Sequence, residues 1–149
     1  MKELWKHQVS GVELARELRH LALFYETGTG KTGTLINILR EEYIKHRRVM
    51  NTLIFTPLSV CPQWKQEFSE FSKIPPEKIL VVTGPGKRRI ELLQAQEDPC
   101  IVITNYEAVQ IKGFYDALME WKPEIAVADE SHRLKDASSK RAKLICPLF

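Results

Sequence analysis

Four residues near the N-terminus could together hold a nucleoside triphosphate and its metal ion. Gly28 and Gly30 can adopt backbone conformations closed to other residues, and they leave room for a phosphate beside the main chain. Lys31 supplies a positive charge for the outer phosphates, and Thr32 offers a hydroxyl to Mg²⁺, which prefers oxygen ligands. The run Glu26–Thr32 therefore has the residue types and the order of a phosphate-binding loop.

The sequence around this loop supports the same interpretation. The apolar run Leu21–Phe24 precedes the loop and predicts a strand, and the helical pattern Thr32–Lys45 follows it. Backbone N–H groups of the loop and of the helix N-terminus would then point at the anion. Tyr25 stands where the general pattern has its first glycine, and an ordinary glycine turn is the alternative. The residues expected to contact the nucleotide here are Thr27, Gly28, Thr29, Gly30, Lys31, Thr32 and Gly33.

A second pair of polar residues could complete the chemistry. Asp129 and Glu130 follow the short apolar run Ile125–Ala128, which is typical of a strand buried on both faces. Ligands gather at the carboxyl ends of parallel strands, where Lys31 and Thr32 would also lie. We therefore expect Asp129 to hold Mg²⁺ through a water molecule, and Glu130 to polarise the attacking water while Lys31 binds the phosphates. An acidic cap on the following helix is the alternative interpretation of this segment.

These two segments resemble motifs I and II of superfamily-two helicases and translocases. The continuation His132–Asp136, with Ser138–Lys140 after it, is similar to the Swi/Snf-type branch, whose members are ATP-dependent translocases on double-stranded DNA. Leu4–Gln8 resembles the N-terminal glutamine motif, in which Gln8 would read the adenine edge. The resemblance implies ATP and Mg²⁺ as cofactors, with Gln8 and His132 as further residues of the nucleotide site.

The resemblance also extends to segments that face the nucleic acid in the family, and it covers nearly the whole chain. It implies that double-stranded DNA is a partner and that Lys87–Arg89 is the best basic cluster for contacting it. The cluster Lys45–Arg48 ends a predicted helix, where cations meet the helix dipole favourably, and is expected to be structural. The residues expected at the DNA are Pro57, Leu58, Ser59, Thr83, Gly84, Lys87, Arg88, Thr104, Asn105 and Tyr106.

Composition sets bounds on these interpretations. A chain of 149 residues with 44% hydrophobic and 28% charged residues is typical of one globular domain. The net charge of +3 does not by itself indicate nucleic-acid binding. No apolar run approaches the length of a membrane span, so no membrane partner is expected. Three scattered cysteines without metal-binding spacing predict reduced thiols, and hence an intracellular protein, cytoplasmic or nuclear.

Short apolar runs alternate with helical patterns along the chain. Strands are predicted at Leu21–Phe24, Thr52–Phe55, Ile79–Val82, Cys100–Ile103 and Ile125–Ala128. Helices are predicted near His7–Leu18, Thr32–Lys45, Cys61–Phe71, Lys87–Ala95, Gly113–Trp121 and Ser138–Leu144. Such alternation indicates right-handed crossovers and a parallel sheet covered on both faces. With the resemblance, it predicts an α/β fold, a three-layer RecA-like P-loop NTPase domain spanning residues 1–149.

The chain departs from the resembled family at its end. The strand that carries motif III should follow the Asp-Glu motif and lie beside the phosphate-loop strand, but the chain ends at Phe149. We therefore expect a truncated first lobe without its second RecA-like lobe and with hydrolysis near background. We also expect a gap between the strands Leu21–Phe24 and Ile125–Ala128. Either the tail Leu144–Cys146 or self-association with a second copy could fill that gap.

Two other functions fit parts of the sequence. The motor lobe of a restriction or repair helicase would keep the nucleotide chemistry, but the continuation Arg133–Lys135 favours the Swi/Snf-type branch. A non-catalytic binding module could use Trp64 and Lys87–Arg89 to hold nucleic acid or protein, although Trp64 is expected mainly to pack against the sheet. The presence of all four of Lys31, Thr32, Asp129 and Glu130 argues against such a module.

Overall fold

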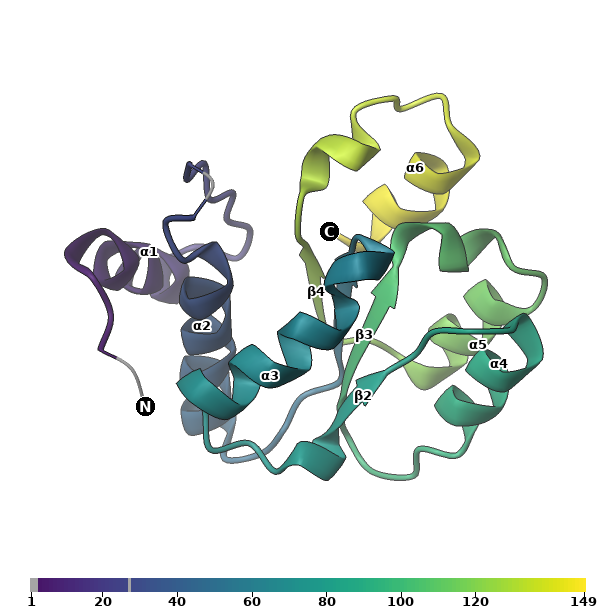
Figure 1. The fold of residues 1–149 in the computed structure, drawn as a ribbon, viewed down its shortest axis with the longest axis horizontal. Coiled ribbons are helices and arrows are strands. Elements are labelled where there is room, and N and C mark those ends of the chain that lie inside the picture. Colours follow the sequence, from purple (N-terminus) through teal and green to yellow (C-terminus); the bar gives the residue numbers. More distant parts are fainter. Residues whose placement is uncertain (1–2, 27) are drawn as a thin grey trace.

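The computed structural model describes residues 3–26 and 28–149 and has an α/β fold built on a parallel sheet (Figure 1). Strand β1 lies inside the sheet, between β3 and β4, and β2 pairs with the other side of β3. Because the pairing is parallel throughout, the carboxyl ends of the strands meet at one edge, the carboxyl edge. The strands are β1 (Thr52–Thr56), β2 (Ile79–Val81), β3 (Ile101–Asn105) and β4 (Ile125–Ala128).

Six helices of the described residues surround this sheet. They are α1 (Lys6–Glu17), α2 (Lys31–His46), α3 (Cys61–Phe71), α4 (Gly86–Gln94), α5 (Phe114–Trp121) and α6 (Lys140–Ile145). Short 3-10 turns follow β1 and β3 closely, at Leu58–Val60 and Tyr106–Gln110, and a third, Ser131–Leu134, comes soon after β4. The chain therefore turns sharply after β1, β3 and β4 at the carboxyl edge.

The core has two halves because successive strand residues point to opposite faces of the sheet. Leu53 and Phe55 of β1 pack with α4, α5 and α6, while Ile54 between them packs with α2 and α3. Figure 1 shows this separation, with α2 and α3 on one side of the sheet and α4 and α5 on the other. The two helical layers make the three-layer arrangement that the sequence predicts, and they fix the directions in which the strand ends point.

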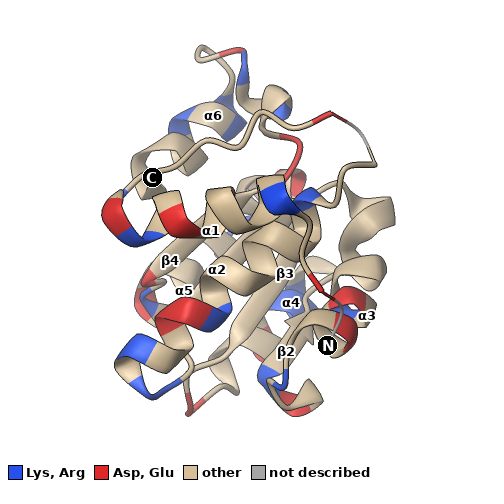
Figure 2. Cartoon of the chain, turned by 90° about the vertical axis from the view of Figure 1, so that its left-hand side faces the viewer, with Lys and Arg blue, Asp and Glu red and all other residues tan. Residues whose placement is uncertain are grey.

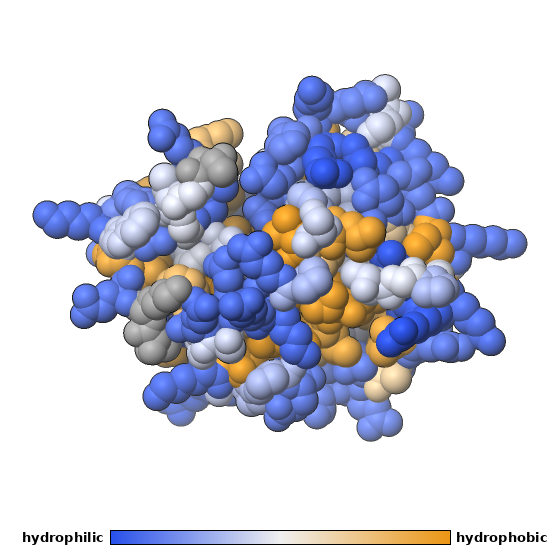
Figure 3. Space-filling model, in the orientation of Figure 1, coloured by the Kyte–Doolittle hydropathy of each residue, from blue (hydrophilic) through white to orange (hydrophobic). Residues whose placement is uncertain are grey.

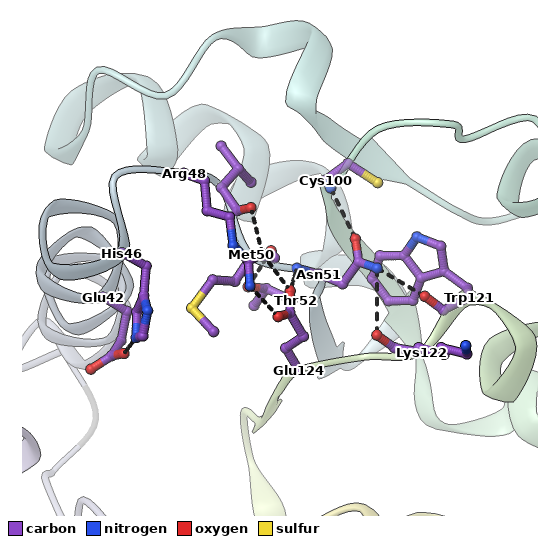
Figure 4. A network of polar contacts seen from close by, with 11 residues as sticks. Glu42, His46, Arg48, Met50, Asn51, Thr52, Cys100, Trp121, Lys122 and Glu124 are labelled. Carbon is purple, nitrogen blue, oxygen red and sulfur yellow. Dashed lines mark hydrogen bonds and ion pairs between the residues drawn. The ribbon is translucent and has the colours of Figure 1, made fainter.

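A hydrogen-bonded network, the amino-edge network, closes the opposite edge of the sheet (Figure 4). Asn51 precedes β1, and its side chain donates to the Trp121 carbonyl at 2.8 Å and accepts from the Cys100 backbone N–H at 3.3 Å. Its own backbone N–H donates to Glu124 Oε2 at 2.9 Å, and the Arg48 guanidinium binds the same carboxylate with two nitrogens. These bonds hold together the starts of β1, β3 and β4.

Most of the predicted elements are confirmed, with bounds that shift by one or two residues. Helix α3 and strand β4 have the predicted bounds. The predicted strand Leu21–Phe24 is wrong, because this segment has no regular structure and pairs with no strand. The side chain of Phe24 is 95% exposed, so the apolar run does not enter the core. An extended segment needs a neighbouring strand for its backbone hydrogen bonds, and β4 is the edge of the sheet among the described residues.

The C-terminal tail does not fill the place beside β4. Leu144 and Ile145 end α6 instead, and the side chain of Ile145 is fully buried in the half of the core that contains α4 and α5. Because Leu21–Phe24 forms no strand, the gap expected between it and Ile125–Ala128 is not present as predicted. Strand β4 is instead an edge of the sheet among the described residues, and the tail Leu144–Cys146 does not pair with it. No helix of the described residues is long and apolar enough to cross a membrane.

The basic cluster at the end of α2 has local acidic partners. Lys45 and His46 lie 3.7 and 3.2 Å from the carboxylate of Glu42, and Arg48 belongs to the amino-edge network. Figure 2 views the molecule from the α1–α2 side and shows acidic and basic residues interspersed along the chain. This pairing agrees with the structural role predicted for Lys45–Arg48.

Candidate active site

The loop before α2 is built around two glycines in the left-handed conformation. Gly28 has φ 82°, and Gly30 has φ 79° and ψ 35°, angles that strain a residue with a β-carbon. Between them, the hydroxyl of Thr29 donates to the Glu26 carbonyl at 2.7 Å and closes the turn. Helix α2 begins one residue after Gly30, so its unpaired N–H groups open onto the loop. The loop therefore offers backbone donors to an anion; Thr27 lies outside the described residues.

Thr32 and Gly33 continue the first turn of α2 in different surroundings. Thr32 is half-buried and directly follows Lys31, so its hydroxyl lies in the turn that faces the loop. Gly33 is buried, and a β-carbon there would come within 2.9 Å of the Phe71 ring of α3. Gly33 thus allows α2 and α3 to pack closely, and its predicted contact with the nucleotide stays a prediction.

The carboxylate of Asp129 is held rigidly at the carboxyl edge. Asp129 follows β4 directly and is only 9% exposed. Its Oδ2 accepts a hydrogen bond from Trp64 Nε1 at 2.9 Å and another from Thr56 Oγ1 at 3.2 Å. The hydroxyl of Tyr106 donates to its backbone carbonyl at 2.6 Å. Buried polar groups need such partners, so this side chain has a fixed orientation.

Glu130, the next residue, has a more open environment. Its backbone is left-handed, with φ 56° and ψ 49°, and its side chain is 39% exposed. Glu130 Oε1 lies 3.9 Å from Lys31 Nζ, and Oε2 lies 3.2 Å from His132 Nδ1. Lys31 Nζ also donates to the Tyr25 carbonyl at 3.1 Å, which holds the amine beside the loop. The structure therefore brings the predicted loop lysine and the predicted Asp-Glu pair together.

The two acids have environments that suit different chemistry. A rigid carboxylate such as Asp129 can orient a metal-bound water, whereas the exposed Glu130 can reach a water molecule beside a phosphate. Mg²⁺ fits this edge, because it typically takes one or two protein oxygens and completes its shell with water and phosphate oxygens. The hydroxyl of Thr32 and the carboxylate of Asp129 are donors of this kind. No group of three or more His, Cys, Asp or Glu residues in the described part of the chain forms a cage for another metal.

Helix α1 is fastened to the phosphate loop through Gln8. The side chain is 4% exposed, and its Oε1 accepts from the Trp5 backbone N–H at 2.8 Å. Its Nε2 donates to the Gly30 carbonyl at 2.9 Å. A primary amide has two N–H donors and two acceptor lone pairs, so one donor and one lone pair remain after these bonds. That remaining pair is the combination with which an amide can bind the N6 and N7 atoms of adenine.

His7 and Tyr25 also hold α1 against the loop, in roles that sequence reasoning missed. His7 Nε2 lies 3.0 Å from the Thr29 carbonyl, and the hydroxyl of Tyr25 donates to the His7 carbonyl at 2.7 Å. The two rings meet edge to face with centroids 5.2 Å apart. Tyr25 occupies the place of the first glycine of the general pattern, and that departure was the available signal. Because Tyr25 binds His7 of α1, the position of the loop depends on α1.

The first group of predicted DNA residues lies on exposed turns of the carboxyl edge. Pro57 follows β1 and leads into the turn Leu58–Val60, where Leu58 is 54% exposed and Ser59 is also exposed. The apolar residue Leu58 therefore lies on the surface. Its position agrees with the contact predicted for this turn, which stays a prediction.

The second group lies at the start of α4. Gly84 has φ 92° and is exposed, while Thr83 before it is half-buried. Lys87 and Arg88 are exposed on the first turn of the helix, and Lys87 lies 3.7 Å from Glu91 one turn later. The backbone at Gly84 and these two cations could approach a phosphate backbone together.

The third group is internal in this structure. Thr104, Asn105 and Tyr106 are buried at the end of β3. Thr104 Oγ1 donates to the Val82 carbonyl at 2.8 Å, and Asn105 Oδ1 accepts from Arg89 Nη1 at 2.7 Å. These side chains position the turns around them, and direct contact with DNA is not available to them in this arrangement.

Arg89 differs from its basic neighbours and corrects the sequence interpretation of the cluster Lys87–Arg89. It is buried, and its guanidinium also donates to the Gly84 carbonyl at 2.8 Å and to Thr104 Oγ1 at 3.2 Å. Burial lowers the pKa of this guanidinium. Its spacing was a usable signal, because Leu93, four residues later, is on the same, core-facing side of α4. Arg89 therefore joins the turn after β2 to the end of β3.

Glu107 connects this group to the segment after the Asp-Glu pair. Its carboxylate accepts from Asn105 Nδ2 at 2.8 Å and from Arg141 Nη1 at 3.0 Å. Burial raises the pKa of Glu107, but the Asn105 hydrogen bond and the nearby arginines outweigh it, so the pKa lies below its usual value. Arg141 Nη2 also donates to the Arg133 carbonyl at 2.6 Å. The start of α6 and the turn after Glu130 are thereby fixed to β3.

Trp64 also has a role that sequence reasoning missed. It was expected to pack against the sheet, and it does, with no exposed surface. Its indole N–H also binds Asp129, 65 residues away in the chain. A buried tryptophan usually finds a partner for its N–H group, but nothing in the local sequence indicates which acceptor it will be.

A groove of about 350 Å³ lies elsewhere, between α3 and β2. Figure 3 shows apolar atoms at the centre of this face, among hydrophilic ones. Its lining includes Pro62, Lys65, Gln66, Ser69, Ile74, Pro76, Ile79 and Val81. None of the predicted nucleotide or DNA residues lines this groove, so it is not part of the candidate site.

Comparisons with known proteins give this geometry a family. Residues 7–148 match the family described as "SNF2-related domain". The chain is 36% identical over 119 residues to "Chromodomain-helicase-DNA-binding protein 1-like" of Danio rerio. This match covers 76% of this chain and 11% of that protein. The chain is 29% identical over 157 residues to "TATA-binding protein-associated factor MOT1" of Saccharomyces cerevisiae, covering 95% of this chain and 8% of that protein.

The chain is also similar to a bacterial protein. An "Uncharacterized ATP-dependent helicase" of Mycoplasma pneumoniae is 29% identical over 145 residues, covering 94% of this chain and 14% of that protein. The chain thus spans between 8% and 14% of the length of these three relatives.

The fold also matches solved structures. The structure titled "Sulfolobus solfataricus SWI2/SNF2 ATPase core in complex with dsDNA" superposes with a TM-score of 0.77 at 21% identity, covering 96% of this chain and 29% of that chain. A type ISP restriction-modification enzyme, LlaGI, gives a TM-score of 0.66 at 19% identity, covering 88% of this chain and 15% of that chain. At these identities the likeness shows the fold. With the family match over residues 7–148, the chain belongs to the SNF2-related domain family and has the fold of the N-terminal, RecA-like lobe of a Snf2-type helicase.

Proposed function

We propose that this lobe binds ATP with Mg²⁺ at the carboxyl edge of its sheet, as the ATP-binding lobe of a DNA-dependent translocase. One observation carries the proposal: Lys31 Nζ and Glu130 Oε1, from opposite ends of the chain, lie 3.9 Å apart beside the glycine loop. This separation is an ion pair at the limit of contact, so neither group is committed to a short hydrogen bond with the other. A purely structural pair would gain from closer hydrogen bonding.

Each residue has a defined part in this proposal. The loop Gly28–Gly30 and the start of α2 bind the phosphates through backbone N–H groups, and Lys31 neutralises the outer ones. Bound Mg²⁺ would join the phosphates to Thr32 and, through water, to Asp129. Glu130 orients and polarises the water that attacks the terminal phosphate.

Gln8 supplies the base contact in the same proposal. Its remaining N–H and lone pair match the acceptor and donor on the N7 and N6 atoms of adenine. His132 Nδ1 lies 3.2 Å from Glu130 Oε2, so His132 would interact with the bound nucleotide indirectly, through that carboxylate.

DNA is the proposed macromolecular partner. The solved SWI2/SNF2 core that shares this fold is described in complex with double-stranded DNA. The exposed turn Leu58–Val60 and the start of α4 with Lys87 and Arg88 lie at loops of the kind that position ligands at the carboxyl edge. Phosphate contacts by these cations would hold the duplex without reading its sequence.

We further propose that residues 1–149 alone bind ATP weakly and hydrolyse it near background. Lys31 and His132 are the basic side chains within 4 Å of the Glu130 carboxylate among the described residues, and no arginine in this part of the chain comes as near. An arginine from a second RecA-like lobe would complete the site, and such a group typically contributes about 10³–10⁵ in turnover. The open edge of β4 also offers a place for a further strand or for a second copy.

A restriction or repair motor is a second candidate, favoured by the fold shared with LlaGI. It would use the same ATP chemistry, so the nucleotide site does not separate the two. The family match over residues 7–148 supports the Swi/Snf-type function first.

The nucleotide site can be tested on the chain itself with a fluorescent ATP analogue, titrated with and without Mg²⁺. We expect Mg²⁺-dependent binding, weakened about 10- to 100-fold in Lys31→Ala, because a hydrogen bond to a charged group is lost. Lys45→Ala is the matched control, since Lys45 lies at the other end of α2 and is 65% exposed. Unchanged affinity in Lys31→Ala would remove Lys31 from its role, and absence of Mg²⁺-dependent binding by the unaltered chain would overturn the proposal.

The turnover proposal has a separate test. Steady-state hydrolysis by residues 1–149 with saturating duplex DNA should remain near background. Robust turnover by the monomer would show that the lobe needs no arginine from outside it.

A further inference from the structure

The carboxylate of Asp129 is bound asymmetrically. Both side-chain hydrogen bonds that it receives go to Oδ2, from Trp64 Nε1 at 2.9 Å and from Thr56 Oγ1 at 3.2 Å. Among the described residues, nothing donates a hydrogen bond to Oδ1. One oxygen is therefore committed to the protein, and the other remains available for a ligand.

Both donors are buried and have fixed positions. Trp64 and Thr56 have no exposed surface. Trp64 is packed in the core between α3 and the sheet, with the Phe68 ring 6.0 Å away, and Thr56 is the last residue of β1. Hydrogen bonds to an ionised carboxylate are among the stronger ones, and burial prevents water from replacing them. Rotation of the Asp129 carboxylate would leave two buried donors without an acceptor, so its orientation is set by these two side chains.

The backbone of Asp129 is fixed as well. Its N–H donates to the Phe55 carbonyl at 2.8 Å, and its carbonyl accepts from the Tyr106 hydroxyl at 2.6 Å. Position and orientation of the carboxylate are thus determined by the ends of β1 and β3 and by α3. This is more support than a helix-capping acid needs, and a cap would direct the carboxylate at backbone N–H groups instead.

We infer that Trp64 and Thr56 are positioning residues for the metal carboxylate: by holding Oδ2, they direct Oδ1 of Asp129 towards the Mg²⁺ of the nucleotide complex. The inference rests on the proposed function. Mg²⁺ requires near-octahedral geometry, so the direction of each oxygen that holds it or its water matters. Groups that hydrogen-bond a metal-ligating carboxylate typically account for about 10- to 100-fold in metal affinity.

The test uses pairs of variants that keep shape and change hydrogen bonding. Thr56→Val removes the hydroxyl and retains the branched side chain, whereas Thr56→Ser retains the hydroxyl. Trp64→Phe removes the indole N–H and some of the packing. Phe68→Leu, on the same buried side of α3, is the control for lost packing without a lost hydrogen bond.

The readout is metal affinity in the presence of ATP, measured with Mn²⁺ by electron paramagnetic resonance on the whole chain. We expect Thr56→Val and Trp64→Phe to weaken Mn²⁺ binding to the protein–ATP complex by about 10-fold. Thr56→Ser and Phe68→Leu should stay within about twofold of the unaltered chain. Binding of the fluorescent ATP analogue in EDTA should be the same in all variants, because the positioning acts through the metal.

The outcomes separate the inference from the function on which it rests. If the unaltered chain shows no metal-dependent ATP binding, the proposed function fails. If it binds metal and ATP but Thr56→Val and Thr56→Ser have equal Mn²⁺ affinities, the positioning inference fails. A loss of ATP binding in EDTA as large as the loss of Mn²⁺ affinity would also overturn the inference, because it would show a general structural effect. Should Trp64→Phe not fold, the two Thr56 variants still decide the question.

Discussion

The two edges of the parallel sheet use their polar side chains in different ways. At the amino edge, the side-chain amide of Asn51 both donates and accepts hydrogen bonds (Figure 4). The backbone N–H and the backbone carbonyl of Asn51 are hydrogen-bonded as well. At the carboxyl edge, Lys31 and Glu130 approach only to 3.9 Å, and Oδ1 of Asp129 receives no hydrogen bond from any residue that the structure describes. The first edge is complete as it stands, whereas the second has bonding capacity left for a ligand.

This difference separates structural from functional polar clusters without reference to any relative. A structural cluster is most stable when its donors and acceptors are all paired within the protein. A binding site must leave some of them for the ligand. The comparison therefore predicts which changes will affect stability and which will affect binding.

The largest expected effect is the stabilisation of the fold by Mg·ATP bound at the carboxyl edge. At a concentration 100 times Kd, Mg·ATP should raise the free energy of unfolding by about 2.7 kcal/mol. The same increase is expected in Asn51→Ala, which changes the other edge. At the same Mg·ATP concentration, Lys31→Ala should gain only about 0.4 to 1.4 kcal/mol, because its Kd is expected to be about 10- to 100-fold higher. Urea unfolding with and without Mg·ATP measures it. An unchanged increase in Lys31→Ala would break the comparison.

The next effect concerns the amino edge. Asn51→Ala leaves the Trp121 carbonyl and the Cys100 N–H without their partner, and the free energy of unfolding should fall by about 2 kcal/mol. Gln63→Ala is the control, because that exposed amide donates one hydrogen bond, to Glu67 in the same helix. Both variants should bind the ATP analogue as the unaltered chain does. A loss of ATP binding in Asn51→Ala would show that the two edges are not independent.

The pH dependence of stability should report the same network. The hydrogen bond from Arg48 lowers the pKa of Glu124 to about 2, from 4.5. A carboxylate with a lowered pKa stabilises the fold above its unfolded pKa, so its contribution should be lost as the pH falls from about 4.5 towards about 2. Glu124→Gln should remove about 1 kcal/mol at neutral pH. The difference in stability between the two proteins should vanish at the acid end, and a constant difference would contradict the assignment.

The smallest effect compares two strained backbones. Lys122, before β4, has φ 58° and ψ 73°, and Glu130, after β4, has φ 56° and ψ 49°. Lys122→Gly and Glu130→Gly should each relieve strain by about 0.5 to 1 kcal/mol, because glycine tolerates this region. The first variant should leave ATP binding and metal affinity unchanged, while the second should lose the water-polarising carboxylate. Denaturation curves and the hydrolysis assay in the complete motor distinguish the two outcomes.

Sequence reasoning worked where the signal is local. The apolar runs of β1 to β4 and the order of Gly28, Gly30 and Lys31 predicted the sheet and the loop, because strand burial and phosphate binding impose a pattern on consecutive residues. It failed at Leu21–Phe24, whose apolar composition resembles a strand but which has no neighbour to pair with.

The contacts that sequence reasoning missed are long-range. The bond from Trp64 to Asp129 joins residues 65 apart, and Arg89 of α4 binds Thr104 and Asn105 at the end of β3, 15 and 16 residues away. No periodicity records such a pair, since each member satisfies the local pattern equally well with another partner. The same holds for Asn51, which looks like an ordinary residue before a strand.

The parallel register also has a consequence for synthesis. Thr52 of β1 pairs with Ile101 on one side and with Ile125 on the other, and Asn51 meets Glu124 across 73 residues. A nascent chain that has not yet reached Ala128 therefore carries strand β1 with one edge unpaired. Contacts this distant form slowly, and the unpaired N–H and C=O groups of that edge are vulnerable to association meanwhile. The ribosome must release nearly the whole lobe before its folding can be completed.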